Sequence, residues 1–168
     1  MLNPPTQLIS RLGVGRKDVV VDFGCGPGFY TIPLARIATR TIGVDVSPTM
    51  LQRARQNCEN NGVRVELILS DGRSIDLEAE SIELLLMVHV FHEIGNKEEV
   101  LHEFSRLLKV SGRLAIVEKT RAEDFFSRRF GPPVIDYDDA VNSLTQGGFR
   151  VNEVVQNRED SVIIASKM

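Results

Sequence analysis

The chain has 168 residues, of which 42% are apolar and 26% are charged, and its formal net charge is -3 at pH 7. This length and composition indicate one globular domain, residues 1–168, with enough apolar side chains for a buried core. The near balance of acidic and basic residues excludes a broad electrostatic attraction to nucleic acid or to anionic lipid. The two cysteines, Cys25 and Cys58, form no spaced set, which argues against a metal site or a disulfide framework.

The sequence shows no secretory signal and no membrane-spanning segment. Its longest apolar run, Leu84 to Val88, is far shorter than a membrane span. Because paired cysteines are also missing, we expect a protein of the reducing cytoplasm.

Predicted strands and helices alternate along the chain. Short apolar or β-branched runs bounded by turn residues predict strands at residues 18–23, 41–45, 63–69, 81–88 and 113–118. Helices are predicted at residues 31–39, 98–108 and 138–146. A further helix follows the second strand, with Ser47 as its N-cap and Pro48 in its first position, and it ends near Asn61 and Gly62.

The last part of the chain predicts an antiparallel hairpin. Residues 149–155 and 161–165 both have the composition of strands, and only five residues, 156–160, separate them. A parallel crossover needs about a dozen residues or more, so these two strands must run antiparallel. The sequence therefore predicts a doubly wound α/β sheet of seven strands, mostly parallel, with a C-terminal antiparallel hairpin.

A glycine-rich turn joins the first strand to the helix after it. Gly24, Gly26 and Gly28 alternate with other residues directly after the strand. Glycine permits positive φ angles and lets a ligand approach the backbone closely, and the start of the next helix offers unpaired N–H groups. We expect this turn to bind a nucleoside-bearing cofactor.

Three successive strands end with an acidic residue, namely Asp22, Asp45 and Asp71. Ligands of open α/β sheets bind at the carboxyl ends of the strands, where these side chains meet the glycine-rich turn. Asp45 is placed to accept hydrogen bonds from both hydroxyls of a ribose, and Asp71 is placed to accept a hydrogen bond from an adenine amino group. The alternative is that the three acids only cap turns and helices.

The glycine-rich turn excludes two common classes of cofactor. Phe29 stands where the dinucleotide fingerprint requires glycine or alanine, and the chain has no G-K-[ST] triplet of a P-loop. The turn also has no lysine or arginine to bind a pyrophosphate. These features favour a cofactor with a ribose, a base and a positive charge.

Five motifs resemble those of class I S-adenosylmethionine-dependent methyltransferases, and they occur in the family's order. They are Val-Asp-Phe-Gly-Cys-Gly-Pro-Gly (21–28), Gly-Val-Asp-Val-Ser-Pro-Thr-Met (43–50), Ser-Asp-Gly (70–72), Met-Val-His-Val-Phe-His-Glu-Ile (87–94) and Leu-Leu-Lys-Val-Ser-Gly-Arg-Leu (107–114). The most similar group includes the ubiquinone/menaquinone-biosynthesis and other small-molecule methyltransferases. The resemblance implies a Rossmann-like methyltransferase fold, S-adenosylmethionine as cofactor with S-adenosylhomocysteine as its product, and a small-molecule methyl acceptor.

The resemblance also implies which residues hold the cofactor. The methionine part lies on the glycine-rich turn with Asp22 near its ammonium group, Asp45 holds the ribose, and Asp71 meets the adenine edge. Met50, which packs near the adenine, also fits an ordinary core position on its helix. The full set is Asp22, Gly24, Cys25, Gly26, Gly28, Asp45, Val46, Met50, Asp71, Gly72, Met87, Val88 and His89.

His89 and His92 follow the fourth strand and are the candidate catalytic bases. Methyl transfer from a sulfonium depends mainly on positioning, and a base is needed only where the accepting atom carries a proton of high pKa. Imidazole titrates near neutral pH, which suits this role. The alternative is that His92 only anchors its loop by hydrogen bonds.

Residues after the fourth strand disfavour nucleic acid as a partner, because His-Val-Phe-His (89–92) stands where nucleobase amino-methyltransferases carry N/D-P-P-Y/F. Residues 119–133 keep an RNA or protein methyltransferase open as an alternative, because they mix basic residues with phenylalanines. The same composition suits a wall of a small-molecule pocket or a plain surface helix. A regulatory subunit that binds the cofactor without catalysis, and a homodimer, also stay open.

Overall fold

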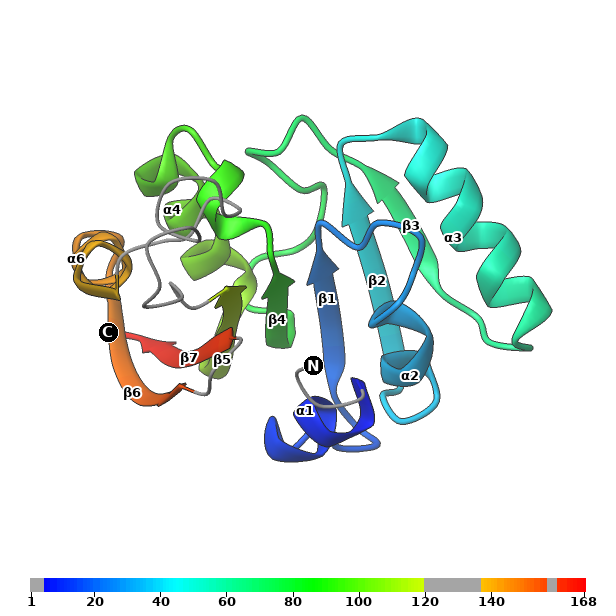
Figure 1. The fold of residues 1–168 in the computed structure, drawn as a ribbon, viewed down its shortest axis with the longest axis horizontal. Helices are drawn as coiled ribbons and strands as arrows, with labels where there is room; N and C mark the ends of the chain where they lie inside the picture. Colours follow the sequence, from blue (N-terminus) through cyan, green and yellow to red (C-terminus); the bar gives the residue numbers. More distant parts are fainter. Residues whose placement is uncertain (1–4, 120–136, 157–159) are drawn as a thin grey trace, which may run out of the picture.

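The computed structural model describes residues 5–119, 137–156 and 160–168. Seven strands in this part of the chain form one sheet in the order β3-β2-β1-β4-β5-β7-β6 (Figure 1). They are β1 (Val19–Phe23), β2 (Arg40–Asp45), β3 (Glu66–Leu69), β4 (Ile82–Val88), β5 (Leu108–Lys119), β6 (Phe149–Gln156) and β7 (Asp160–Lys167). The first five strands pair in parallel, and β7 runs antiparallel to both β5 and β6. The predicted seven-stranded α/β fold with a terminal hairpin is confirmed.

Helices cover both faces of the sheet (Figure 1). They are α1 (Pro5–Arg11), α2 (Thr31–Ala35), α3 (Pro48–Asn60), the 3-10 turn η1 (Phe91–Glu93), α4 (Lys97–Leu107) and α6 (Tyr137–Gln146). Leu8 of α1 and Leu34 of α2 pack with Val20 in the core on one face. Phe104 of α4 and Leu144 of α6 belong to the core on the other face. The sheet is therefore the middle of three layers.

β4 lies at the centre of the sheet, and its side chains alternate between the two cores. Leu84 and Leu86 pack in the core under α1 and α2, whereas Leu85 and Met87 pack in the core under α4 and α6. All four side chains are fully buried. A parallel strand that is covered on both faces requires an unbroken apolar run, which explains the composition of this segment.

α2 is shorter than the predicted helix 31–39 and ends at Ala35. The N–H groups of Thr39 and Arg40 donate to the carbonyl of Asp18, at 3.1 and 3.5 Å. These hydrogen bonds direct the chain into β2. The apolar residues after Ala35 therefore keep the spacing of a helix although α2 has already ended.

β5 is longer than the predicted strand 113–118, and α4 stops one residue before the end of the predicted helix 98–108. Leu108 pairs with Ile82, and a register shift then brings Arg113 opposite Leu84. The irregularity absorbs the extra residues of β5, which is how bulges lengthen one strand of a pair. Smaller differences occur at β3, which begins at Glu66, and in the hairpin, whose strands extend to Gln156 and from Asp160 to Lys167.

No helix within residues 5–119, 137–156 and 160–168 is long and apolar enough to cross a membrane.

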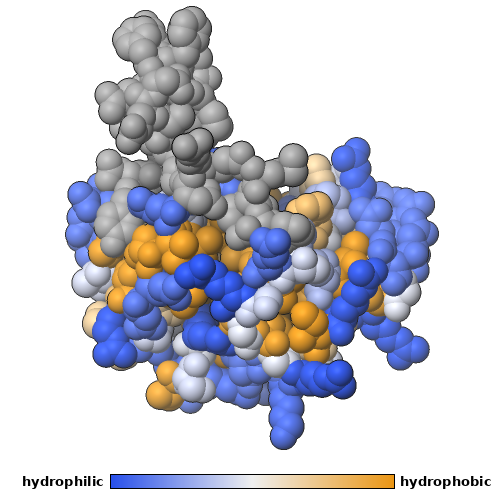
Figure 2. Space-filling view, turned by 60° about the horizontal axis from the view of Figure 1, so that its bottom comes forward, coloured by the Kyte–Doolittle hydropathy of each residue, from blue (hydrophilic) through white to orange (hydrophobic). Residues whose placement is uncertain are grey.

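The face of the molecule shown in Figure 2 has apolar patches among hydrophilic side chains. Exposed large apolar side chains include Phe29, Val46, Leu69 and Val110.

One edge of the sheet collects the chain segments that matter for function. The strand order reverses between β1 and β4, which is where open α/β sheets bind ligands, beyond the carboxyl ends of the strands. β7 starts at this same edge because it is antiparallel to β5, and its first residue, Asp160, pairs with Lys119.

Candidate functional site

The glycine-rich turn after β1 is held against β2 and against the segment after β4. The N–H of Gly24 donates to the carbonyl of Val44 at 2.8 Å. Gly24, Gly26 and Gly28 have φ angles of 73°, 52° and 93°, in the left-handed region that favours glycine. A Cβ on Gly24 would lie 2.3 Å from Cγ2 of Val90. The turn therefore needs glycine for its conformation and, at Gly24, also for its contact with Val90.

Asp45, the last residue of β2, joins the glycine-rich turn to α3. Its Oδ2 accepts the N–H of Gly26 at 2.8 Å, and its Oδ1 accepts the N–H of Ser47 at 2.9 Å. Ser47 is the N-cap of α3, because its Oγ accepts the N–H of Met50 at 3.3 Å. Each carboxylate oxygen has two lone pairs, so both oxygens of Asp45 can still accept a hydrogen bond from a ligand.

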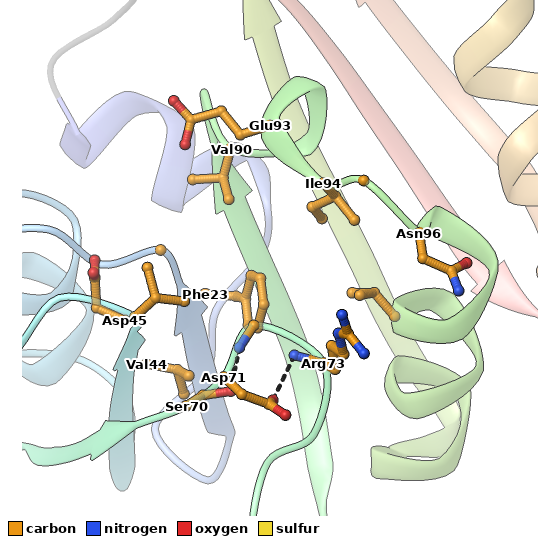
Figure 3. Close-up of a pocket in the computed structure, with 15 residues that line it drawn as sticks. Phe23, Val44, Asp45, Ser70, Asp71, Arg73, Val90, Glu93, Ile94 and Asn96 are labelled. Carbon is orange, nitrogen blue, oxygen red and sulfur yellow. Dashed lines mark hydrogen bonds between the residues drawn. The ribbon is translucent and has the colours of Figure 1, made fainter.

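A cavity of about 400 Å³ opens beside Asp45, at the carboxyl ends of β1 and β2 (Figure 3). This volume lies in the range of small-molecule sites. Val44 and Asp45 lie on one side of the cavity, and Val90 and Ile94, from the segment after β4, lie on the other. Residues far apart in the sequence therefore face one another across it.

Asp71 lies at the rim of the cavity in an exposed turn after β3. Its Oδ1 accepts the N–H groups of Arg73 and Ser74, at 2.9 and 3.1 Å. These hydrogen bonds, first that of Ser74, lower the pKa of the Asp71 carboxyl, so it is ionised at neutral pH. Gly72 follows with a φ angle of 82°, and its N–H donates to Ser70 Oγ at 3.0 Å.

Asp22 lies in β1 behind the glycine-rich turn and is buried. Its Oδ2 accepts a hydrogen bond from Thr31 Oγ1 at 2.6 Å. Burial raises the pKa of Asp22 from 3.8 to about 6; the hydrogen bond from Thr31 opposes this rise, and the charge of Asp45 adds to it. A cationic group near Asp22 would favour the ionised carboxylate.

The segment after β4 carries two histidines, and each of them contacts a buried carboxylate. His89 has a φ angle of 57°, which is unusual for a residue with a Cβ, and its Nε2 lies 3.0 Å from Asp160 Oδ1. Nδ1 of His92 lies 2.8 Å from Glu118 Oε2. Glu118 stands near the end of β5 and Asp160 begins β7, so these four side chains meet at the same edge of the sheet.

Comparison with protein families gives a match to the methyltransferase domain family over residues 21–116. The chain belongs to this family. The match begins in β1, before the glycine-rich turn, and ends within β5. It therefore covers the strands and turns that form the cavity.

Similar curated proteins include ribosomal protein L11 methyltransferases. That of Edwardsiella ictaluri is 32% identical over 79% of this chain and 46% of its own length. That of Shigella sonnei is 30% identical over 72% of this chain and 42% of its own length. The chain thus spans less than half the length of the curated relatives that it matches.

Solved structures agree with the family. An S-adenosylmethionine-dependent methyltransferase from Aquifex aeolicus is 25% identical and has a TM-score of 0.88, with 98% of this chain and 89% of that chain covered. A second one, from Clostridium acetobutylicum, shares the fold at 15% identity with a TM-score of 0.80, covering 98% of this chain and 90% of that one. The chain therefore belongs to a methyltransferase family with the class I fold, and this family and these neighbours imply S-adenosylmethionine as cofactor.

The methyltransferase brings part of the predicted cofactor set together around the cavity. Gly24, Asp45, Val46, Asp71 and Gly72 all line it. The donor set suits a cationic nucleoside, because the carboxylates of Asp45 and Asp71 in the lining keep lone pairs that can accept hydrogen bonds from hydroxyl and amino groups. The residues present therefore fit the cofactor.

Other predicted cofactor residues do not line this cavity. Met87 is fully buried in the core, so only its backbone could face a ligand, and Met50 is half-buried on α3. Burial raises the pKa of the Cys25 thiol well above its usual range, so this cysteine stays a thiol in the turn. The remaining members outside the lining are Asp22, Gly26, Gly28, Val88 and His89.

The sequence did not predict the side of the cavity that is formed by the segment after β4. Val90, Glu93, Ile94 and Asn96 line the cavity, and Arg73 closes another side (Figure 3). The motif at 87–94 marked this segment, but η1 decides which of its side chains face the cavity, and η1 has no clear sequence signal.

The basic and aromatic segment 119–133 lies almost entirely outside the described residues. Only Lys119 belongs to the described part, and its Nζ lies 3.2 Å from Asp160 Oδ1.

Proposed function

We propose that this methyltransferase transfers the methyl group of S-adenosylmethionine to a small-molecule acceptor. The observation that carries the proposal is the cavity where the strand order reverses between β1 and β4, with Gly24 and Asp45 together in its lining. We also propose that residues 1–168 act as one domain in a reducing cytoplasm, which the buried free thiols of Cys25 and Cys58 support.

In this proposal the cofactor lies across the ends of the first four strands. Its adenosine part would occupy the cavity, where Asp45 would accept hydrogen bonds from the ribose hydroxyls and Asp71 would accept one from the adenine amino group. Its methionine part follows the glycine-rich turn, with its ammonium group near Asp22. The remaining members of the predicted set, among them Val46, Met50, Gly72, Met87, Val88 and His89, pack around it.

The cofactor supplies a methyl group on a positively charged sulfur, which is already activated for in-line displacement. The protein has to hold the acceptor in line with that methyl group and to exclude water, and such positioning supplies much of the catalysis in reactions of this kind. We place the acceptor toward the ends of β5 and β7, which contribute no described residue to the lining of the cavity.

A protein acceptor is the second candidate, because the curated relatives are named for the ribosomal protein that they methylate. The match covers less than half of those relatives, so it does not carry their acceptor with it. We place a small molecule first because the five motifs are most similar to those of small-molecule methyltransferases. An RNA acceptor depends on residues 120–133, which are not described, and a regulatory subunit would bind the cofactor without turnover.

Calorimetric titration tests the cofactor assignment. We expect S-adenosylmethionine and S-adenosylhomocysteine to bind and NAD not to bind. Asp45→Ala should weaken S-adenosylmethionine by roughly 1–3 kcal/mol, since it leaves ribose hydroxyls unpaired. Asp76→Ala removes an exposed carboxylate that does not line the cavity and is the matched control. Equal affinities of the two variants would contradict the role of Asp45.

Transfer of a labelled methyl group tests the acceptor class. The protein is incubated with methyl-labelled S-adenosylmethionine and a cell extract separated into small-molecule, protein and RNA fractions. Label in the small-molecule fraction supports the proposal, and label in the protein fraction favours the second candidate. Cofactor binding without transfer to any fraction would indicate a regulatory subunit.

A further inference from the structure

Two buried carboxylates stand outside the cofactor cavity, at the edge formed by β5 and β7. The side chains of Glu118 and Asp160 are only 5% and 2% exposed. An ionised carboxylate is expensive to bury unless it is paired and hydrogen-bonded. In this methyltransferase Glu118 contacts His92 and Asp160 contacts His89, and both histidines belong to the segment after β4. The cost of burying the two carboxylates indicates that both pairs have a function.

Glu118 holds His92 at two points. Its Oε2 lies 2.8 Å from Nδ1 of the imidazole, and its Oε1 accepts the backbone N–H of His92 at 3.3 Å. Because an ionised carboxylate only accepts hydrogen bonds, Nδ1 must carry the proton that joins the two groups. The lone pair of the neutral imidazole is therefore on Nε2.

The Nε2 atom of His92 has no hydrogen bond among the described residues. The charged group that the structure places near it is Glu93, whose Oε1 is 3.8 Å away, beyond hydrogen-bond distance. The His92 side chain is 16% exposed, so it is shielded from solvent but not fully buried. Val90 and Glu93, on either side of His92 in the chain, both line the cofactor cavity.

His89 differs from His92 in the charge of its partner. Asp160 Oδ1 lies 3.0 Å from His89 Nε2 and also 3.2 Å from Nζ of Lys119, so a lysine already compensates this carboxylate. Among the described residues, the hydrogen bonds of the Glu118 carboxylate are all with His92. Glu118 is thus better placed than Asp160 to stabilise an imidazolium.

We propose that His92 is the general base of this methyltransferase and that Glu118 is its positioning residue. The inference rests on the proposed function and adds the chemical class of the acceptor, a small molecule that reacts through an oxygen or nitrogen atom bearing a proton, such as a phenol or an enol. Glu118 fixes the imidazole with Nε2 unprotonated and then stabilises the positive charge that the ring gains.

The step balances without any further reactant. Nε2 of His92 takes the proton of the acceptor, and the electron pair of the acceptor atom forms the new bond to the methyl carbon. The bond between that carbon and sulfur breaks, its electron pair stays on sulfur, and the sulfonium becomes a neutral thioether. The imidazolium afterwards releases its proton to water.

The protonated nitrogen can be observed without any turnover. Long-range proton–nitrogen NMR spectra of histidine-labelled protein without cofactor, recorded at pH 8, report which ring nitrogen carries hydrogen. We expect the proton on Nδ1 for His92 and on Nε2 for His89. A proton on Nε2 of His92 would overturn the assignment of this atom as the base.

Activity is measured as label transferred from methyl-labelled S-adenosylmethionine to the small-molecule fraction. His92→Asn keeps an N–H group near the position of Nδ1 for Glu118 but offers no base, so it should lose roughly 100-fold or more of the rate. His92→Ala should show the same loss and regain part of it when imidazole is added. Glu118→Gln should lose roughly tenfold, and all three variants should bind S-adenosylmethionine within about twofold of the wild type.

His89→Ala is the matched control, with a smaller loss and no recovery on addition of imidazole. An active His92→Asn variant would show that His92 is only structural, and recovery of His89→Ala by imidazole would move the base to the other histidine. Both outcomes overturn this inference while the proposed function stands. A wild-type protein that binds the cofactor but labels no small molecule overturns the proposed acceptor, and this inference with it.

Discussion

At the scale of single residues, the site combines side chains and backbone positions that would be unfavourable elsewhere in a protein. Asp22 is a buried carboxylate, His89 has a positive φ angle, and Gly24 lies so close to Val90 that any side chain would collide with it. Strain and buried charge of this kind gather where a ligand is bound.

Asp22 should make stability depend on pH. Its pKa is about 6 in the folded protein against 3.8 ordinarily, so the stabilisation from its protonated form is complete below about pH 4 and is lost as pH rises through 6. Asp22→Asn stays neutral and keeps an acceptor for Thr31. Relative to wild type, it should therefore gain up to roughly 3 kcal/mol of unfolding free energy between pH 4 and pH 7.

Urea denaturation at several pH values measures this difference. Glu59→Gln, on the exposed surface of α3, is the control and should show no comparable trend. A difference between Asp22→Asn and wild type that does not change with pH would refute the burial argument.

Gly24→Ala should destabilise the protein more than Gly62→Ala does. Both glycines have positive φ angles, 73° and 65°, but a Cβ at Gly62 meets nothing within 4 Å, whereas one at Gly24 lies 2.3 Å from Val90. We expect about 1 kcal/mol for Gly62→Ala from the backbone alone and roughly 2–4 kcal/mol for Gly24→Ala, measured by chemical denaturation. Adding Val90→Ala should recover part of the larger loss. Equal losses of unfolding free energy at the two glycines would mean that Val90 moves away from the added Cβ without cost.

At the scale of helices and strands, the sequence predicted those features that neighbouring residues determine. The alternation of strands and helices, the capping of α3 by Ser47 and the antiparallel hairpin are all confirmed. The predicted boundary of an element was wrong where a contact between distant residues determines it. For example, hydrogen bonds to the carbonyl of Asp18 lead the chain into β2, so α2 ends before the predicted residue. The pairing of His92 with Glu118 and of His89 with Asp160 depends on strand register, and these partners lie 26 and 71 residues apart in the sequence.

Ser47→Ala tests the cap of α3. It removes the oxygen that accepts the N–H of Met50, and such caps contribute about 1 kcal/mol to stability. We expect that loss in the unfolding free energy, together with weaker binding of S-adenosylmethionine, because Ser47 also anchors Asp45 through its backbone. Asn61→Ala, which removes the side-chain hydrogen bond to the carbonyl of Asn57 at the other end of α3, is the control and should lower stability with a smaller change in affinity. Unaltered affinity of Ser47→Ala would show that the cap and the cofactor site are independent.

At the scale of the whole molecule, the sheet divides into a half that holds the proposed cofactor site and a half that carries the carboxylates paired with the two histidines. Residues of β1, β2 and the turn after β3 line the cavity, and the ends of β5 and β7 carry the buried carboxylates. The segment after β4 belongs to both halves. A ligand that fills the cavity should therefore alter one half and this shared segment.

S-adenosylmethionine at about 100 times its dissociation constant should raise the unfolding free energy by about 2.7 kcal/mol. Hydrogen exchange should slow at residues 24–28, 45–47, 70–73 and 90–96, whereas α6 and β6 should show only the change expected from global stability. The experiment compares the protein with and without cofactor, with NAD as the control ligand. Local protection confined to the hairpin would place the cofactor elsewhere.

The reversed direction of β7 has a consequence for how such a domain can diversify. Since β7 begins at the edge where the parallel strands end, the hairpin delivers Asp160 to the histidine side without any change to the glycine-rich turn. Under the proposed function, replacing the hairpin or recombining it between relatives would change the surroundings of His89 while the glycine-rich turn and Asp45 stay as they are. The hairpin is therefore the region to randomise first in a directed search for new acceptors.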